Sequence, residues 1–341
     1  MEEGAGGKGN EFEEDQDGFA EKSAQAIPGD VRMISGCKDA QTSADVSNVQ
    51  QFGLPEDAGP GGAGGACTNA FLAAMEQNPN PSWTGLLRTM RNILSDMGYS
   101  QIPEMSASRR TDLNGPFEIQ TEGDGQKKAL IVGINYVGQQ GELRGCINDA
   151  KSMKNFLEER GFSDFRILTD DDEGFGDDVP TGENIIRGFN WLVEGASAGD
   201  SLFFHYSGHG GSVRDDDGNE KDGKDETIIP VDYRECGQIR DDTIMKSLVM
   251  PLPDDCQLTS IMDCCHSGTV FDLPYLFTAN DDNLDGAEEA EGNGESFTSP
   301  INGNFDLNFA LKLGMQMFQA FQEGGYEAAL QAGLSGFFAN M

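Results

Sequence analysis

The sequence has few basic residues and no long apolar run. Its 341 residues include 23 lysines and arginines against 59 aspartates and glutamates, which gives a formal net charge of −36. Such an acidic chain repels nucleic acid and anionic membrane surfaces, and it attracts cationic partners or divalent metal ions. No apolar run approaches the ~20 residues needed to span a bilayer. We therefore expect neither nucleic acid nor a membrane as a partner.

The sequence also lacks the marks of a secreted protein. Its first residues, Met1–Gly4, carry neither the positive charge nor the apolar stretch of a signal peptide. The seven cysteines are odd in number and do not have the spacing of a disulfide framework, which is typical of a reducing compartment. We expect a monomeric, cytoplasmic protein.

Two apolar stretches, Ser201–Gly211 and Leu258–Gly268, end abruptly at small residues. Each pattern predicts a buried strand followed by a flexible turn. In an open parallel sheet, ligands and chemistry collect at the carboxyl ends of adjacent strands. One strand would deliver an imidazole there and the other a thiol, which is the pair that a cysteine nucleophile and its base require.

A zinc site is an alternative interpretation of the same stretches, because they contain His205, His209, His266, Cys264 and Cys265. Zinc needs ligands that converge in a tetrahedron. Cys264 and Cys265 are neighbours at a strand end, so their side chains are expected on opposite faces. They cannot easily share one metal, which makes zinc the weaker interpretation.

Strand and helix patterns alternate along much of the chain. Lys128–Asn135 is a continuous apolar run, which predicts a central strand covered on both faces. Besides the two stretches above, we expect strands at 31–37, 101–106, 128–135 and 165–168, and helices at 66–75, 82–97, 183–192 and 245–249, with another that ends near 160. This alternation implies an α/β fold with a parallel sheet and right-handed crossovers.

The His-Tyr-Ser-Gly-His-Gly-Gly and Asp-Cys-Cys-His-Ser-Gly stretches resemble the catalytic motifs of metacaspases, the caspase-like cysteine peptidases of plants, fungi, protists and algae. The match is specific, because both motifs occur in the family's order and separation. The resemblance implies an α/β caspase-like fold, with a mostly parallel central sheet flanked by helices. It also implies that His209 is the catalytic histidine and that Cys265, directly before His-Ser-Gly, is the nucleophile.

The chemistry of these residues agrees with that assignment. A Cys265 thiolate would attack the scissile carbonyl, while His209 lowers the pKa of the thiol and later protonates the leaving amine. The backbone N–H groups of Gly210 and Cys265 are candidates for the oxyanion hole. No third orienting acid is evident, so we predict a Cys-His dyad.

Residues 33–45 resemble the small-subunit region of metacaspases. In most of the family this region follows the catalytic part, whereas here it precedes it, as in the type III class of algae. The predicted organisation is an acidic disordered N-terminus at 1–29, a small-subunit region at 30–115, a linker at 116–126, a catalytic region at 127–280, an acidic disordered linker at 281–304 and a helical tail at 305–341.

The resemblance further assigns the binding residues. The pocket for the residue before the scissile bond would be lined by Cys146, Asp149, Ser207 and Asp263. Two carboxylates there predict cleavage after Arg or Lys, and not after Asp. Asp149 also has a purely structural interpretation, because an acid near a helix start is stabilising without any substrate.

Calcium is the cofactor that the resemblance implies. Its ligands would be Asp225, Asp241, Asp242 and Asp272. Ca²⁺ prefers ~6–8 oxygen ligands, several of them carboxylates. Asp241 and Asp242 could instead stabilise a helix N-terminus.

The sequence therefore predicts a calcium-dependent cysteine endopeptidase that acts on proteins and peptides with basic residues. The alternative is a non-catalytic, calcium-responsive scaffold that keeps the caspase fold.

Overall fold

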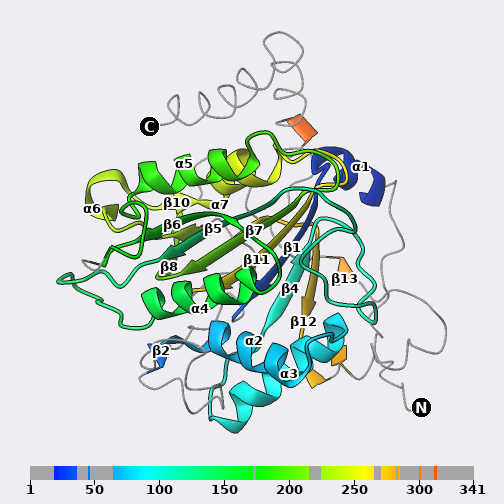
Figure 1. The fold of residues 1–341 in the computed structure, drawn as a ribbon, viewed down its shortest axis with the longest axis horizontal. Coiled ribbons are helices and arrows are strands. Elements are labelled where there is room, and N and C mark those ends of the chain that lie inside the picture. The colour runs from blue at the N-terminus through cyan, green and yellow to red at the C-terminus, as the bar shows by residue number, and fades with distance from the viewer. Residues whose placement is uncertain are drawn as a thin grey trace, which may run out of the picture.

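An eight-stranded sheet forms the centre of the protein (Figure 1). The structure is a computed structural model, and it describes residues 19–36, 45–46, 64–171, 174–214, 224–264, 270–281, 283–284, 299–300 and 311–312. The strand order is β13-β12-β4-β1-β11-β7-β5-β6. In chain order, these strands are β1 (Asp30–Ser35), β4 (Glu104–Ala107), β5 (Lys127–Gly133), β6 (Asp164–Thr169), β7 (Ser201–Ser207), β11 (Gln257–Asp263), β12 (Tyr275–Thr278) and β13 (Ser299–Pro300).

Five neighbouring strands run parallel, and the other edge of the sheet is antiparallel. β1, β11, β7, β5 and β6 pair in parallel, while β4 pairs antiparallel with both β1 and β12. The mostly parallel α/β sheet predicted from the sequence is confirmed. Because β1 and β4 come from the N-terminal region, the two predicted regions share one sheet and one fold.

Helices cover both faces of the sheet (Figure 1). One face carries α2 (Ala66–Gln77), α3 (Trp83–Asp96) and α4 (Cys146–Glu158), and the other carries α1 (Phe19–Ala26), α5 (Gly182–Val193) and the π-helix η2 (Met245–Val249). Alternate residues of β7 enter the two resulting cores: Phe203 faces the first, whereas Leu202 and Phe204 face the second. Burial on both faces explains why β5, β7 and β11 are continuous apolar runs.

A small second sheet begins directly after β7 in the chain. It contains β8 (Gly210–Arg214), β9 (Lys224–Ile228) and β10 (Ile239–Arg240), in the order β10-β9-β8. Two short helices, α6 (Tyr233–Cys236) and α7 (Asp241–Ile244), flank β10 in the chain. A further pair of two-residue strands, β2 (Asp45–Val46) and β3 (Gly64–Gly65), precedes α2.

Three features differ from the sequence-based expectations. Helix α1 forms within the segment 1–29, where disorder is expected, because Ser23, Ala26 and Ile27 are buried against the sheet. Strand β12 extends the sheet beyond the predicted elements. The helix at 245–249 is a π-helix. Most of the predicted segments 281–304 and 305–341 lie outside the described residues.

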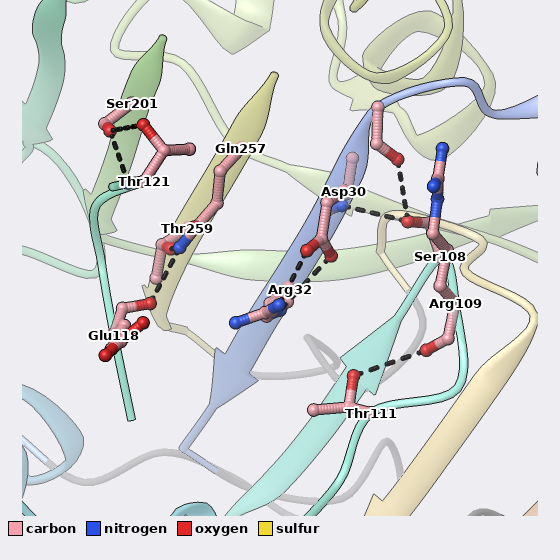
Figure 2. A network of polar contacts seen from close by, with 12 residues as sticks. Asp30, Arg32, Ser108, Arg109, Thr111, Glu118, Thr121, Ser201, Gln257 and Thr259 are labelled. Atoms are coloured by element: carbon pink, nitrogen blue, oxygen red, sulfur yellow. Dashed lines mark hydrogen bonds and ion pairs between the residues drawn. The ribbon is translucent and has the colours of Figure 1, made fainter. Parts of the chain in front are cut away.

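The predicted linker at 116–126 is packed against the sheet. Phe117 is 7% exposed, and its ring contacts Trp83 edge to face with centroids 4.8 Å apart. At the amino ends of the strands, the Gln257 side-chain amide donates to the Glu118 carbonyl (2.7 Å), and the Thr121 N–H donates to Ser201 Oγ (2.9 Å) (Figure 2). The predicted linker thus contacts both regions, at the amino ends of β7 and β11.

None of the helices in the described part of the chain has the length and apolar character needed to cross a bilayer.

Candidate active site

The carboxyl ends of β7 and β11 lie in register. Ser207 is paired with Asp263, and the Gly208 N–H donates to the Asp263 carbonyl at 3.3 Å. The chain turns at Gly208–His209 and continues into β8 at Gly210, the residue predicted for the oxyanion hole. This places His209 and Gly210 at the carboxyl ends of the parallel strands, where open α/β sheets bind their ligands. Cys265 and His266 lie outside the described residues.

A backbone carbonyl orients the His209 ring. His209 Nε2 lies 2.6 Å from the carbonyl oxygen of Gly141. A carbonyl only accepts, so Nε2 carries the proton in this geometry and Nδ1 is the basic nitrogen of the neutral ring. The sequence predicts a dyad because it shows no third acid, and the orienting group found here is a carbonyl, which no residue type reveals.

Three of the four residues predicted for the specificity pocket come together. Asp149, in the first turn of α4, accepts hydrogen bonds from Ser207 Oγ (2.7 Å), from the Gly65 N–H (2.8 Å) and from Asn69 Nδ2 (3.1 Å). Asp263 accepts from the Thr68 N–H at 2.7 Å. Cys146, the fourth predicted residue, begins α4 and is buried.

The start of α2 covers both carboxylates. Asp149 is 2% exposed and Asp263 is 5% exposed. Gly65 lies between them: a Cβ on this residue would be 2.1 Å from Asp263 Oδ2 and 2.9 Å from Asp149 Oδ2. The carboxylates therefore accept hydrogen bonds from N–H groups at the N-terminus of α2 in this structure. Sequence reasoning missed Gly65, Thr68 and Asn69, although a glycine pair directly before a helix is the signal for such a close approach.

His205 is buried beneath this helix start. Its Nε2 lies 3.2 Å from Thr68 Oγ1, and the residue is fully buried. Nδ1 has no hydrogen-bond partner among the residues that the structure describes. Burial lowers the pKa of His205 from 6.5 to about 3. The ring is therefore neutral throughout the physiological range and serves as a packed core residue.

The shifted pKa of His205 predicts instability in mild acid. The unfolded chain binds a proton at His205 as the pH falls below 6.5, while the folded protein does not until pH 3. The stability present above pH 6.5 is thus lost progressively toward pH 3, by roughly 4–5 kcal/mol at about 1.4 kcal/mol per unit. We expect the free energy of unfolding of His205→Gln, measured in urea, to fall less between pH 7 and pH 5 than that of the wild type. The more exposed His209→Gln is the matched control, and an equal fall in all three proteins would contradict the prediction.

Acidic residues gather at the start of α7. One carboxylate oxygen from each of Asp241, Asp242 and Asp272 lies within 4.8 Å of the others, in the one such group of potential metal ligands found among the described residues. Asp241 is 1% exposed and accepts hydrogen bonds from the Glu226 N–H (2.6 Å) and the Asp242 N–H (2.7 Å). Burial, together with the charge of Asp272, raises the pKa of Asp241 to about 10. This cluster is short of positive charge.

Two cations lie at the margin of the cluster. Arg240 Nη1 is 2.5 Å from Asp225 Oδ2, and Lys246 Nζ is 2.8 Å from Asp242 Oδ2. Asp225 contributes to the raised pKa of Asp241, but its side chain is turned to Arg240 in this structure. The structure thus brings together three of the four predicted calcium ligands and places the fourth beside them.

Cys264 belongs to the second core. It is 1% exposed, and its thiol is close enough to the phenols of Tyr136 and Tyr206 to raise their pKa values. A buried thiol in this position behaves as a small apolar side chain.

Two protein-family models match separate parts of the chain. Residues 127–274 match the metacaspase, peptidase C14 domain, and residues 3–114 match the caspase domain. The N-terminal region therefore resembles part of the caspase fold, as its shared sheet indicates.

Several curated proteins are similar in sequence. The chain is 47% identical over 273 residues to Metacaspase III c of Phaeodactylum tricornutum, which covers 77% of this chain and 80% of that protein. It is 53% identical over 158 residues to Metacaspase-1 of Mycosarcoma maydis, and 53% identical over 157 residues to Metacaspase-1 of Meyerozyma guilliermondii. These two alignments cover 46% and 45% of this chain, and the chain spans 39% and 38% of the lengths of these relatives.

Proposed function

From the premise that this chain belongs to the metacaspase family of caspase-like cysteine peptidases, we propose that it is a calcium-dependent endopeptidase that cleaves after Arg or Lys. The observation that carries the proposal is the convergence of Asp149, Ser207 and Asp263 at the strand ends that lead to His209. Its substrates would be proteins with accessible basic residues, which a net charge of −36 attracts. Its monomeric state and cytoplasmic location remain predictions from the sequence.

The proposed reaction uses Cys265 and His209. The Cys265 thiolate attacks the scissile carbonyl carbon, and the carbonyl electrons move to the oxygen, which Gly210 and Cys265 N–H groups would stabilise. Collapse of this intermediate breaks the C–N bond, and the imidazolium of His209 protonates the leaving amine. Neutral His209 then takes a proton from water, which hydrolyses the thioester and releases the acid. The Gly141 carbonyl supports these roles because it keeps the proton on Nε2.

The acidic cluster supports a calcium site. Asp241, Asp242 and Asp272 present hard oxygen ligands close together, and their mutual repulsion is expressed in the raised pKa of Asp241. A divalent cation would relieve that repulsion, because Ca²⁺ binds carboxylate oxygens. When bound, it would supply positive charge that holds α7 and the segment around Asp272 in one arrangement. Asp225 could join the ligands by exchanging Arg240 for the metal.

Asp272→Asn is expected to remove the response to calcium while keeping the fold. Asp272 has a φ of 44°, a conformation that asparagine also tolerates. In a chelator, the variant should be as stable as the wild type or more so, because the charge that repels Asp241 is gone. Calcium at about 100 times its Kd stabilises a single-site protein by ~2.7 kcal/mol, which raises Tm by roughly 5–10 °C. We expect that shift in the wild type and none in the variant.

The matched control for Asp272→Asn is Asp254→Asn, which removes the same charge from an exposed position (84%). It should keep the full calcium shift in Tm. A calcium shift that survives in Asp272→Asn would rule out this site.

A peptidase assay tests the function as a whole. Wild-type protein would be given matched peptides that end in Arg, Lys or Asp before a fluorogenic leaving group, with calcium and with chelator. We expect release from the Arg and Lys peptides, in calcium only, and none from Cys265→Ala. A wild type that cleaves none of the peptides but still gains stability in calcium would instead be a non-catalytic scaffold.

A further inference from the structure

Two buried tyrosines surround the backbone of His209. Tyr136 follows β5 and is 1% exposed, and Tyr206 lies in β7 and is 0% exposed. Their hydroxyl oxygens are 3.2 Å apart. Neither has a part in the proposed reaction, and a buried phenol needs a hydrogen-bond partner.

The partners of both hydroxyls are the backbone groups of His209 and Ile229. Tyr206 Oη donates to the His209 carbonyl at 2.7 Å, and Tyr136 Oη accepts from the His209 N–H at 3.0 Å. Tyr136 Oη donates to the Ile229 carbonyl at 2.6 Å, and Tyr206 Oη accepts from the Ile229 N–H at 3.2 Å. The N–H and C=O groups of both residues are therefore tied to the tyrosine pair.

His209 needs such support because it lies between two glycines. Gly208 and Gly210 leave the backbone on either side of the histidine with more conformational freedom than other residues would. Gly208 is also required by the pair itself, since a Cβ there would be 2.8 Å from Tyr206 Oη and 3.1 Å from Tyr136 Oη. The same glycine that admits the hydroxyls thus loosens the turn that they hold.

Tyr136 also contacts the imidazole. The two ring centroids are 4.7 Å apart, with an angle of 35° between the ring planes. Tyr136 has a φ of 52°, which is uncommon for an aromatic residue and brings its side chain under the turn. Burial raises the pKa of both phenols, so each remains a donor at any working pH.

We propose that Tyr136 and Tyr206 are positioning residues that fix the place of the catalytic imidazole through the His209 backbone. The inference rests on the proposed function of His209, and it adds the two residues that hold the imidazole in position. The tyrosines do not touch the substrate or the reacting atoms. Through the backbone they set the position of the ring, so that Nε2 can donate to the Gly141 carbonyl and Nδ1 can accept the proton of the Cys265 thiol.

Removing one hydroxyl tests the positioning role. Tyr136→Phe and Tyr206→Phe keep the ring and its packing. Tyr136→Phe removes the acceptor of the His209 N–H, and Tyr206→Phe removes the donor to the His209 carbonyl, which then keeps only the Ile229 N–H at 3.1 Å. A displacement of about 1 Å can cost on the order of 10²-fold in rate. We expect kcat on an Arg peptide, per titrated active site, to fall by about 10- to 100-fold in each variant, with KM changed by less than about threefold. The double variant should lose less than the product of the two single losses.

The control is Tyr275→Phe, which removes a buried hydroxyl from β12 in the other core and should keep wild-type kcat. Assays would be run below the Tm of every variant, so that a loss of stability is not mistaken for a loss of kcat. Unchanged kcat in both Tyr136→Phe and Tyr206→Phe would overturn the inference.

Imidazole ¹⁵N spectra separate this inference from the proposed function. The chain has three histidines, so the His209 signals can be assigned by their loss in His209→Gln. Both Phe variants should shift the His209 Nε2 and Nδ1 signals away from the Nε2–H tautomer or broaden them, while Tyr275→Phe leaves them unchanged. A wild type without peptidase activity would overturn the proposed function alone, and unchanged His209 signals would overturn the positioning role.

Discussion

Replacing Cys265 with alanine is expected to abolish peptide cleavage, with kcat/KM falling by at least on the order of 10⁴-fold. The reaction begins with a covalent bond to this sulfur, and no other group in the proposed mechanism can form it. His209→Ala should lose nearly as much, because the thiolate and its base act as one unit. The double variant should therefore be hardly worse than Cys265→Ala.

Cys264→Ala is the internal control for this prediction. Its thiol is buried in the core beside Tyr136 and Tyr206, so the variant loses packing and not chemistry. We expect kcat within a few-fold of the wild type and a stability loss of roughly 1–2 kcal/mol, measured by denaturant unfolding. Cleavage by purified Cys265→Ala, or a folded Cys264→Ala that has lost all activity, would reassign the nucleophile.

The elements that the sequence predicts are those in which buried residues form a regular pattern, either a continuous apolar run or a helical spacing. β5, β7 and β11 are buried on both faces, and each therefore appears as an unbroken apolar run. Helix α3 begins after Ser82, whose Oγ accepts from the Gly85 N–H (3.0 Å), and buries Leu86, Leu87, Met90 and Leu94 at helical spacing. Local patterns of this kind carry their own signal.

Short elements that depend on distant contacts escaped prediction. Helix α1 lies in a segment rich in Gly and Glu, and it forms because Ala26 and Ile27 are buried in the second core. Strand β12 has four residues, too few for a periodic pattern, and it is fixed by pairing with β4. In both cases tertiary packing outweighs local composition.

In the candidate site, too, some features can be predicted from the sequence and others cannot. Resemblance could propose a role for Asp149 and Asp263, because the proposed role depends on a carboxylate side chain, which the sequence shows. It could not show that the Gly65 and Thr68 N–H groups occupy them, or that the Gly141 carbonyl orients His209, because backbone donors and acceptors are the same in every residue. Tyr136 and Tyr206 are likewise typical core residues in the sequence, and only the positions of their hydroxyls distinguish them.

The second large effect is expected in specificity. Peptides with Arg or Lys before the scissile bond should be cleaved, and the matched Asp peptide should not be cleaved measurably. An aspartate side chain would meet the buried carboxylates of Asp149 and Asp263 without a cation, which costs several kcal/mol. A guanidinium is matched to a carboxylate and can pair with it through two hydrogen bonds.

To reach the two carboxylates as proposed, a basic side chain would first have to displace the start of α2. Gly65 lies between the two carboxylates, and the N–H groups of Gly65 and Thr68 satisfy them in this structure. The substrate cation therefore has to offer stronger hydrogen bonds than these neutral donors. Charged donors do so, because charge-assisted bonds are roughly twice as strong as neutral ones. The same exchange disfavours neutral side chains, which cannot compete with the helix start.

Asp263→Asn tests this account with the least disturbance. The new side chain can keep its amide oxygen toward the Thr68 N–H, whereas Asn at position 149 would meet three donors at once. Removing one of the two carboxylate partners of a desolvated guanidinium costs about 3–5 kcal/mol, so kcat/KM for the Arg peptide should fall by roughly 10²- to 5 × 10³-fold.

The peptide control is citrulline, which has the shape of arginine without its charge. Wild-type enzyme should prefer Arg to citrulline by a factor of the same size, and Asp263→Asn should lose most of that preference while cleaving the citrulline peptide as the wild type does. Both peptides would be measured at one ionic strength, because salt weakens the long-range attraction of a basic substrate to this acidic protein. An Asp263→Asn variant that still prefers Arg to citrulline as strongly as the wild type would show that Asp263 does not recognise the basic side chain.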